Sequence, residues 1–488
     1  MCAYERGALA PTFRVLSQEQ IERLYAATLE CLSRTGLHVH NAEARDLLAR
    51  AGAQVEGIRV RIPPHVIGDA VAATPRSFTL WARPSEDGAA LAAGLDLQVE
   101  PDRTYFGAGP TCTYFMDPNT GERRKARRGD PALTALVSDA LDNIDYVMGL
   151  ALIDDVPHHL APVYEFAEMV INTAKPVLPW AYRVDNVRDI YDIALAVAGS
   201  EQALRARPFL GLFVTYQSPL IQTDEDLATA FWVAERGIPV VLIGGGAAGT
   251  SAPVTGAGTL VISLAGALAM LAIIQLRHPG APVCIGGVPE AMDLRTARPC
   301  YGGPEMSLYS AAMAEVARHL GLPFMGTAGA SESKVLDLQA AIESTFQVVV
   351  SGMSAAALIH DVGFLDCADI GSLESLVMND EIISMTRRLM RGIEVTDETL
   401  MLDLIDRVGP GGEFVSTKET ARRCRREIWN PTLFDRQAWV GWEAEGSKDT
   451  RDRIRERLQA ILANHRPPAL PAGSLARIEE ILEQARGR

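Results

Sequence analysis

The stretch Ile238–Leu276 reads IPVVLIGGGAAGTSAPVTGAGTLVISLAGALAMLAIIQL and contains no charged residue. Such a stretch fits either a lipid bilayer or the interior of a large fold. A membrane-spanning helix needs roughly 20 apolar residues, and Thr255–Leu276 is long enough. The stretch nevertheless stands alone in the chain and lacks a flanking basic cluster or a belt of Trp and Tyr. We therefore predict a buried strand, a glycine turn and a long buried helix.

The same alternation of apolar runs and helix-length segments extends over most of the chain. Eight runs recur, at residues 104–109, 147–153, 176–182, 208–216, 238–245, 281–288, 323–329 and 356–364. Eight strand–helix units close a (β/α)8 barrel, whereas an open doubly wound sheet would tolerate uneven spacing. The even spacing favours the α/β class with a TIM barrel. We predict an N-terminal helical and mixed cap at residues 1–100, the barrel at 101–391 and a C-terminal helical extension packed on it at 392–488.

Local patterns predict where particular elements begin and turn. The order Ser17-Gln18-Glu19-Gln20 has the form of a capping box and predicts the start of a helix. A Pro-Asn-Thr-Gly turn at 118–121 predicts a hairpin inserted between the first barrel strand and its helix. Asp337 has the position of a helix N-cap.

Composition and motifs argue against several function classes. The net charge of -15 and the pI of about 5.2 argue against nucleic acid as a partner. The start of the chain does not resemble a signal peptide, and seven scattered cysteines predict reduced thiols in the cytoplasm. No metal motif or P-loop is present, and GGGAAG at 244–249 lacks the spacing of a dinucleotide fingerprint.

In a barrel the site lies where the strands end, so the ends of the apolar runs supply the candidates. Aromatic rings are frequent there, and rings around a pocket attract a quaternary ammonium through cation–π contacts; the alternative is that they are barrel packing. The ring candidates are Tyr105, Tyr182, Tyr216 and Phe364. The polar candidates are Arg183, Glu332 and His360. Two further strand ends carry only glycine, and we expect them to leave the mouth of the barrel open. They hold Gly244, Gly245, Gly246, Gly286 and Gly287.

Several ordered segments resemble the trimethylamine methyltransferase family. They are APVTGAGTLVISLAGALAMLAIIQLRHPGAPVCIGG (252–287), MDLRT (292–296), GGPEMSLYSAAMAEVARHLGLPF (302–324), SESKVLDLQAAIES (331–344), FMDPNTGERRKARRGD (115–130) and IWNPTLFDR (428–436). The resemblance covers roughly Leu16 to Arg457. It implies a TIM barrel that moves a methyl group from a methylated amine to the cobalt of a corrinoid, or cobalamin, carried by a separate protein. Every position holds an ordinary residue, so the chain resembles the non-pyrrolysine subgroup, whose substrates include glycine betaine.

The resemblance also assigns expected roles to the candidates. Tyr105, Tyr182, Tyr216 and Phe364 would surround the cation, His360 and Arg183 would hold a substrate carboxylate, and Glu332 would line the mouth. The glycine ends would face the corrinoid. No covalent or acid–base residue, no metal and no tightly bound cofactor is expected, because a quaternary ammonium leaves as a neutral amine and catalysis is by positioning.

Two alternatives stay open at this point. One is a protein that binds or senses a quaternary amine without turning it over. The other is a methyltransferase on the same barrel that uses an O- or S-methyl donor. Homo-oligomers without nucleic acid or membrane contacts are expected in each case.

Overall fold

The structure is a computed structural model that describes residues 12–88, 94–354 and 356–488. Its centre is a six-stranded parallel sheet with the strand order β6-β17-β16-β13-β11-β9. The strands are β6 (Tyr105–Ala108), β9 (Leu212–Thr215), β11 (Val240–Ile243), β13 (Val283–Gly286), β16 (Phe324–Thr327) and β17 (Leu358–Val362). The protein is thus a mixed α/β structure with a parallel sheet, as the sequence predicts.

Two further segments link the edge strands β9 and β6 through isolated parallel bridges. Val177 bridges to Leu210, and Trp180 bridges to Phe213 at β9. Val147 in turn bridges to Val177, and the neighbouring Tyr146 bridges to Gly107 in β6. These segments fall within the predicted runs 147–153 and 176–182 or at their edge, although neither forms a regular strand.

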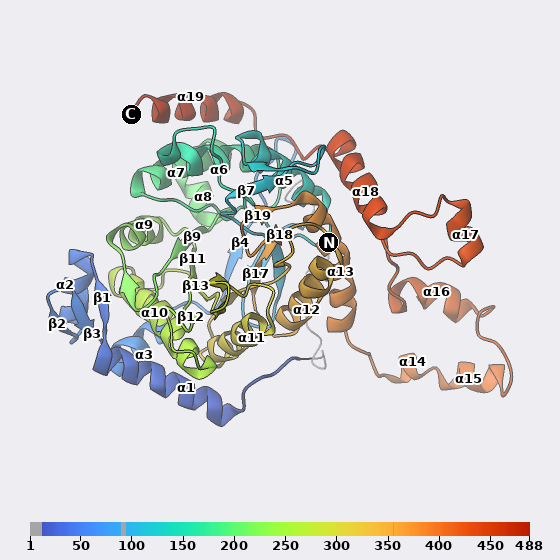
Figure 1. Ribbon diagram of the computed structural model, residues 1–488, viewed down its shortest axis with the longest axis horizontal. Helices are drawn as coiled ribbons and strands as arrows, with labels where there is room; N and C mark the ends of the chain where they lie inside the picture. The colour runs from blue at the N-terminus through green and yellow to red at the C-terminus, as the bar shows by residue number, and fades with distance from the viewer. Residues whose placement is uncertain (1–11, 89–93, 355) are drawn as a thin grey trace.

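Helices surround the strands, as Figure 1 shows. They are α5 (Gly129–Ala140), α6 (Ala161–Ile171), α7 (Val184–Ala198), α8 (Glu201–Ala206), α9 (Asp224–Glu235), α10 (Gly256–Arg277), α11 (Pro304–His319), α12 (Leu338–Met353) and α13 (Leu373–Met390). Asp337 caps α12 by accepting a hydrogen bond from the backbone N–H of Ala340, which confirms the predicted N-cap.

The uncharged stretch forms β11, a turn and α10, as predicted. Helix α10 is long and apolar enough to cross a membrane, but 78% of its most apolar window is buried inside the protein. One side packs on β13, and the N-terminal helices α1 (Gln18–Glu30), α2 (Ala42–Arg50) and α3 (Pro64–Ala73) cover another. A helix that is buried over most of its length is apolar on nearly all sides. Its composition therefore reflects burial in protein.

The N-terminal segment is joined to the loop after β9 by backbone hydrogen bonds. Its first helix α1 carries the predicted capping box between Ser17 and Gln20. Its three-stranded sheet contains β1 (Leu37–Val39), β2 (Gln54–Glu56) and β3 (Arg59–Arg61), and β1 pairs in parallel with β10 (Ile221–Gln222) in the loop after β9. This pairing joins positions far apart in the sequence, and the sequence alone did not indicate it.

A second antiparallel pair closes the amino end of the parallel strands. Strands β4 (Phe78–Leu80) and β5 (Leu97–Val99) share one apolar cluster with Tyr105 and Leu358, the first residues of β6 and β17. Leu80 and Val99 are fully buried in this cluster. The amino end is therefore filled by side chains.

Loops at the carboxyl ends carry smaller sheets. Strands β7 (Tyr114–Met116) and β8 (Arg123–Lys125) form the hairpin predicted from the Pro-Asn-Thr-Gly turn. They continue into β19 (Ile370–Gly371) and β18 (Phe364–Leu365) from the loop after β17. After β13, strand β14 (Glu290–Asp293) pairs with β12 (Ala247–Ala248) and β15 (Arg298–Pro299).

The C-terminal residues divide into a packed part and a projecting part. Helix α18 (Thr450–Asn464) packs on α5 and α13, and α19 (Ser474–Arg486) packs on α7. The helices α14 (Asp397–Leu400), α15 (Leu402–Val408), α16 (Lys418–Glu427) and α17 (Trp439–Ala444) extend away from the body at the right of Figure 1.

Candidate functional site

A cavity of about 560 Å³ lies at the carboxyl ends of the parallel strands. Its wall combines the ends of β9, β11 and β17 with the loops that follow them. Thr111 and Glu225 line it and are exposed, so the cavity reaches the surface there. A cavity of this size suits a small molecule.

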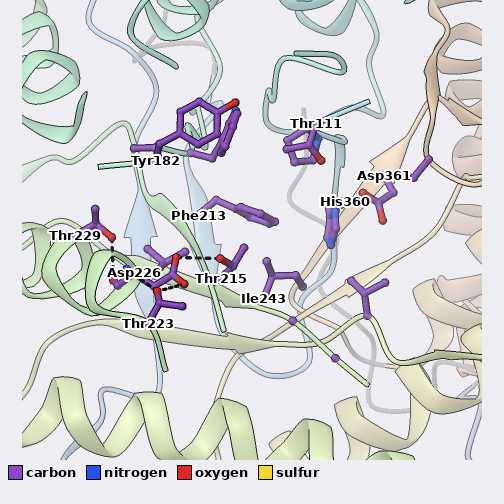
Figure 2. Close-up of a pocket in the computed structure, with 18 of the residues that line it drawn as sticks. Thr111, Tyr182, Phe213, Thr215, Thr223, Asp226, Thr229, Ile243, His360 and Asp361 are labelled. Carbon is purple, nitrogen blue, oxygen red and sulfur yellow. Dashed lines mark hydrogen bonds and ion pairs between the residues drawn. The ribbon is translucent and has the colours of Figure 1, made fainter. Parts of the chain in front are cut away.

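Six aromatic rings face this cavity: Trp180, Tyr182, Phe213, Tyr301, His360 and Phe364. Figure 2 shows Phe213 near the centre, with Tyr182 on one side and His360 on the other. The rings of Trp180 and Tyr182 meet edge to face with centroids 4.4 Å apart, and those of Phe213 and His360 do so at 5.7 Å. Such edge-to-face contacts fix ring orientation.

The Trp180 indole is held in place by a buried carboxylate. Its Nε1–H donates to Oε2 of Glu165 over 3.0 Å, and the other oxygen of Glu165 accepts the backbone N–H of Ile153. Burial raises the pKa of Glu165 to about 7, against the opposing effect of these two hydrogen bonds. Burial and the charge of Glu165 also raise the pKa of Tyr182 to about 12.

A β-bulge at the end of β17 turns two neighbouring side chains toward the cavity. The pairing of β17 with β6 shifts register between Ile359 and Val362, and Asp361 adopts a left-handed φ of 75°. In a regular strand, His360 and Asp361 would point to opposite faces. The extra residue brings both into the wall, where bulges often re-aim functional side chains.

The two bulge residues differ in their hydrogen bonding. Oδ2 of Asp361 accepts from the hydroxyls of Tyr301 at 2.6 Å and Thr327 at 2.5 Å. Nδ1 of His360 lies 2.5 Å from Oδ1 of Asp361, but the imidazole is not oriented for a hydrogen bond. Both ring nitrogens of this buried histidine lack a hydrogen-bond partner among the described residues.

Four carboxylates line the cavity, and none of the described lining residues is Lys or Arg. The carboxylates belong to Glu225, Asp226, Glu290 and Asp361. Asp226 accepts hydrogen bonds from the hydroxyls of Thr215 and Thr223, as Figure 2 shows. The wall is therefore acidic as well as aromatic.

Glu290 differs from Asp226 and Asp361, whose carboxylates accept hydrogen bonds, and from Glu225, which is exposed. It is half-buried at the start of β14, and its side chain makes no hydrogen bond or ion pair within the described part of the chain. Burial raises its pKa to about 7. An unpaired carboxylate at a cavity wall is costly unless a cation compensates it.

The structure brings some predicted site residues together at the cavity and separates others. Those at its wall are Tyr182, His360, Phe364, Gly244 and Gly245. Those outside it are Tyr105, Arg183, Tyr216, Gly246, Gly286, Gly287 and Glu332.

The two tyrosines outside the cavity were placed at the wrong end or on the wrong face. Tyr105 begins β6, so its buried ring packs at the amino end, where its hydroxyl accepts the backbone N–H of Gln98. Tyr216 follows β9, but its ring turns outward between Gly244 and Gly266, and its hydroxyl donates to the carbonyl of Gly286. Both rings pack in the protein interior, as the alternative to a site role that the sequence left open.

Arg183 and Glu332 also contact other groups than expected. Arg183 is the N-cap residue of α7, is exposed, and pairs with Asp185 at 3.4 Å. Glu332 accepts the backbone N–H of Gly302 in a neighbouring loop. Neither side chain lines the cavity.

The strand-end glycines are required by close packing rather than by an open mouth. A Cβ at Gly286 would lie 2.3 Å from the carbonyl oxygen of Leu242, and one at Gly245 would lie 2.5 Å from that of Val288. A Cβ at Gly246 would meet Ala252, and one at Gly287 would meet Met313. Close packing thus accounts for these glycines, and their expected role of keeping space for a corrinoid stays a prediction.

Sequence reasoning missed several lining residues. Trp180 and Phe213 stand at strand ends and could have been chosen by the rule that selected Tyr182. Glu290 follows β13 by a few residues, so its position in a strand-end loop was a usable signal. Tyr301 lies deep in the same loop and carries no local signal.

Comparison with known proteins places the chain in a family of methyltransferases. The family described as trimethylamine methyltransferase (MTTB) matches residues 6–486. The chain belongs to this family.

Curated relatives match over nearly their whole length. The chain is 29% identical to a glycine betaine methyltransferase of Desulfitobacterium hafniense (strain Y51), covering 98% of each chain. It is 31% identical to the trimethylamine methyltransferase MttB of D. hafniense (strain DSM 10664 / DCB-2), covering 96% of this chain and 93% of the relative. Among solved structures, the monomethylamine methyltransferase MtmB of Methanosarcina barkeri has a TM-score of 0.51 at 9% identity, covering 98% of this chain and 88% of that one. This last likeness concerns the fold alone.

Proposed function

We propose that this protein transfers a methyl group from a methylated ammonium compound to the corrinoid of a separate partner protein. The observation that carries the proposal is the cavity wall, in which six rings and four carboxylates occur without a Lys or Arg among the described lining residues. Rings and carboxylates both favour a bound cation. The related glycine betaine and trimethylamine methyltransferases act on compounds that carry or can carry such a charge.

The position of the cavity supports the same proposal. Strands β6 to β17 and the two bridged segments would form a closed (β/α)8 barrel, because the bridges connect β9 with β6. In such barrels the carboxyl-end loops hold the site. The proposed domain limits at residues 100/101 and 391/392 separate this barrel from the cap and the extension.

The residues of the chain would act by positioning. Trp180, Tyr182, Phe213 and Phe364 would contact the N-methyl groups, each ring contributing roughly 0.5–2 kcal/mol. During transfer the C–N bond breaks, its electron pair stays on nitrogen, and the amine departs neutral. A quaternary substrate therefore needs no proton from the protein. Because positive charge leaves nitrogen in the transition state, a very tight cage would favour substrate over transition state.

The methyl acceptor would approach from outside. A reduced corrinoid supplies a nucleophilic cobalt that takes the methyl group. A cavity of about 560 Å³ matches drug-sized ligands such as a small methylated amine. The exposed rim at Thr111 and Glu225 is the side from which a partner protein would present it.

We also propose a homo-oligomer, in the cytoplasm. Large apolar side chains are exposed along the projecting segment, including Ile393 at 81%, Val415 at 73% and Val440 at 77%. Apolar patches of this kind mark protein contacts. The six cysteines in the described ranges are free thiols, which suits a reducing compartment. Sedimentation of the wild type should show an oligomer that a Trp439→Ser, Val440→Ser double variant weakens; a wild-type monomer would contradict this.

The test of the reaction is a methyl-transfer assay. The purified chain is mixed with Ti(III)-reduced cob(I)alamin, and in parallel with reduced corrinoid proteins encoded beside its gene. The donors are tetramethylammonium, choline, glycine betaine, trimethylamine, methanol and dimethyl sulfide. Loss of Co(I) absorbance together with a demethylated amine supports the proposal. Binding without transfer would favour a sensing protein, and transfer from methanol or dimethyl sulfide alone would favour another donor.

A further inference from the structure

We infer that the cavity selects methylated ammonium cations that carry no carboxylate, with Glu290 as the counter-ion that discriminates against betaine-type zwitterions. This inference rests on the proposed function and narrows its substrate class. It depends on the charges that face the cavity and on the contacts that those charges already make.

The first step concerns the groups that could hold a substrate carboxylate. Neither Lys nor Arg occurs among the described residues of the wall, and Arg183, the expected partner, pairs with Asp185 on the surface. Arg298 and Lys334, from nearby loops, both reach Asp366 and lie outside the wall. An anionic group in the cavity would therefore meet no cationic side chain of fixed charge.

The second step concerns His360, whose imidazole carries a positive charge when it is protonated. Its Nδ1 lies 2.5 Å from the Asp361 carboxylate. A protonated His360 would be balanced by this neighbour, so the pair would carry no net positive charge. A substrate carboxylate would still face Glu225, Asp226 and Glu290 without compensation. Burying an uncompensated charge is strongly unfavourable.

The third step concerns Glu290 itself. Asp361 is committed to two hydroxyl donors and Asp226 to two others. Glu290 has no hydrogen bond or ion pair within the described residues, and it lines the cavity together with the rings. An ammonium among the rings would supply the charge that this carboxylate lacks. Nitrogen carrying only methyl or hydroxyalkyl groups satisfies this environment, whereas an added carboxylate opposes it.

The test is calorimetric binding with matched probes at pH 8. Choline is compared with glycine betaine, which adds the carboxylate, and with 3,3-dimethylbutan-1-ol, which keeps the shape and removes the charge. We expect choline to bind at least tenfold more tightly than either. Glycine betaine binding as tightly as choline would overturn the inference while leaving the methyl-transfer proposal intact. If none of the three binds, the proposed function fails as well.

Two glutamine variants assign the selectivity to a residue. Glu290→Gln should weaken choline binding about tenfold and should narrow the preference for choline over glycine betaine. Glu332→Gln is the matched control, because Glu332 is a half-buried glutamate that accepts a backbone N–H outside the cavity. It should leave both affinities unchanged. Equal effects of the two variants on choline binding would show that Glu290 is not the discriminating counter-ion. If a variant fails to fold, the ratio of choline to glycine betaine affinity in the wild type still tests the selectivity.

Discussion

The two ends of the parallel strands use similar residues for different purposes. At the amino end, β4 and β5 fill the space with apolar side chains, and Tyr105 packs among them. At the carboxyl end, rings of the same kind surround a cavity with unsatisfied carboxylate and imidazole groups. The role of a tyrosine therefore depends on the strand end at which it lies and on the side to which its ring turns, since Tyr216 at the carboxyl end turns outward and is structural. Substitutions at the two ends should separate stability from binding.

The largest expected effect is a loss of stability at the amino end. Leu80→Ala removes a fully buried side chain from the closing strand pair, and it should lower the free energy of unfolding by about 2–5 kcal/mol. Urea denaturation measures this change. Choline affinity of the folded fraction should stay as in the wild type. A large affinity loss in fully folded protein would show that the two ends are coupled.

A smaller loss of stability is expected from a glycine at the carboxyl end. Gly286→Ala places a Cβ against the backbone oxygens of Leu242 and Met325, and it should destabilise the protein by about 1–3 kcal/mol. Gly68→Ala in helix α3 is the control, since nothing lies near its added Cβ and alanine favours helices by roughly 1 kcal/mol. If Gly286→Ala left the melting temperature unchanged, the packing explanation of this glycine would be incorrect.

Removing one aromatic ring at each end of the parallel strands compares the two ends with the same kind of substitution. Tyr182→Leu should weaken choline binding roughly 2- to 30-fold, which corresponds to the range of about 0.5–2 kcal/mol for one cation–π contact. Tyr105→Leu should leave this affinity unchanged and lower the melting temperature, because its ring belongs to the core. Calorimetry and thermal denaturation of both variants measure the two quantities. Equal affinity losses would contradict the assignment of the two ends.

The smallest expected effect is the dependence of choline binding on pH. Burial raises the pKa of Glu290 to about 7, so the empty cavity holds this group partly protonated near neutrality. A bound cation favours the ionised form, and affinity should therefore rise between pH 6 and pH 8. The other titratable groups near the cavity are Glu165, Glu225, Asp226, His360, Asp361, Tyr182 and Tyr301. Glu290→Gln should make choline affinity nearly independent of pH. If the pH dependence of the variant matched that of the wild type, one of those other groups would be its cause.

The same raised pKa predicts a dependence of stability in the opposite sense. A carboxyl group whose folded pKa exceeds its ordinary value of 4.5 contributes most to stability when protonated. Stability from Glu290 should therefore fall as pH rises from about 4.5 through about 7. The wild type should lose more stability over this window than Glu290→Gln does, as urea midpoints at several pH values would show.

The sequence predicted those features that depend on short-range patterns. The apolar runs located the parallel strands, the turn at 118–121 located the β7–β8 hairpin, and Ser17 and Asp337 located helix starts. The uncharged stretch was assigned to protein interior because it stood alone. Each of these follows from neighbouring residues and needs no knowledge of distant contacts.

The features that were missed depend on contacts between distant segments. The parallel pairing of β1 with β10 joins the N-terminal segment to the loop after β9. The bulge that turns Asp361 inward departs from the alternation on which strand patterns rest. Tyr216 was wrongly expected at the substrate site. Its ring turns outward because Gly266 in α10 leaves room for it, and the sequence near Tyr216 does not reveal that contact. Tyr301 reaches the cavity only through the folded loop after β13.

The most direct test of the central claim is the position of a bound cation. Tetramethylarsonium has the shape and charge of tetramethylammonium, and arsenic gives an anomalous signal in a crystal. The account predicts one strong peak in the carboxyl-end cavity, within about 6 Å of the Trp180 and Phe213 ring centroids and beside the Glu290 carboxylate. A saturated crystal whose only arsenic peaks lie elsewhere would contradict it.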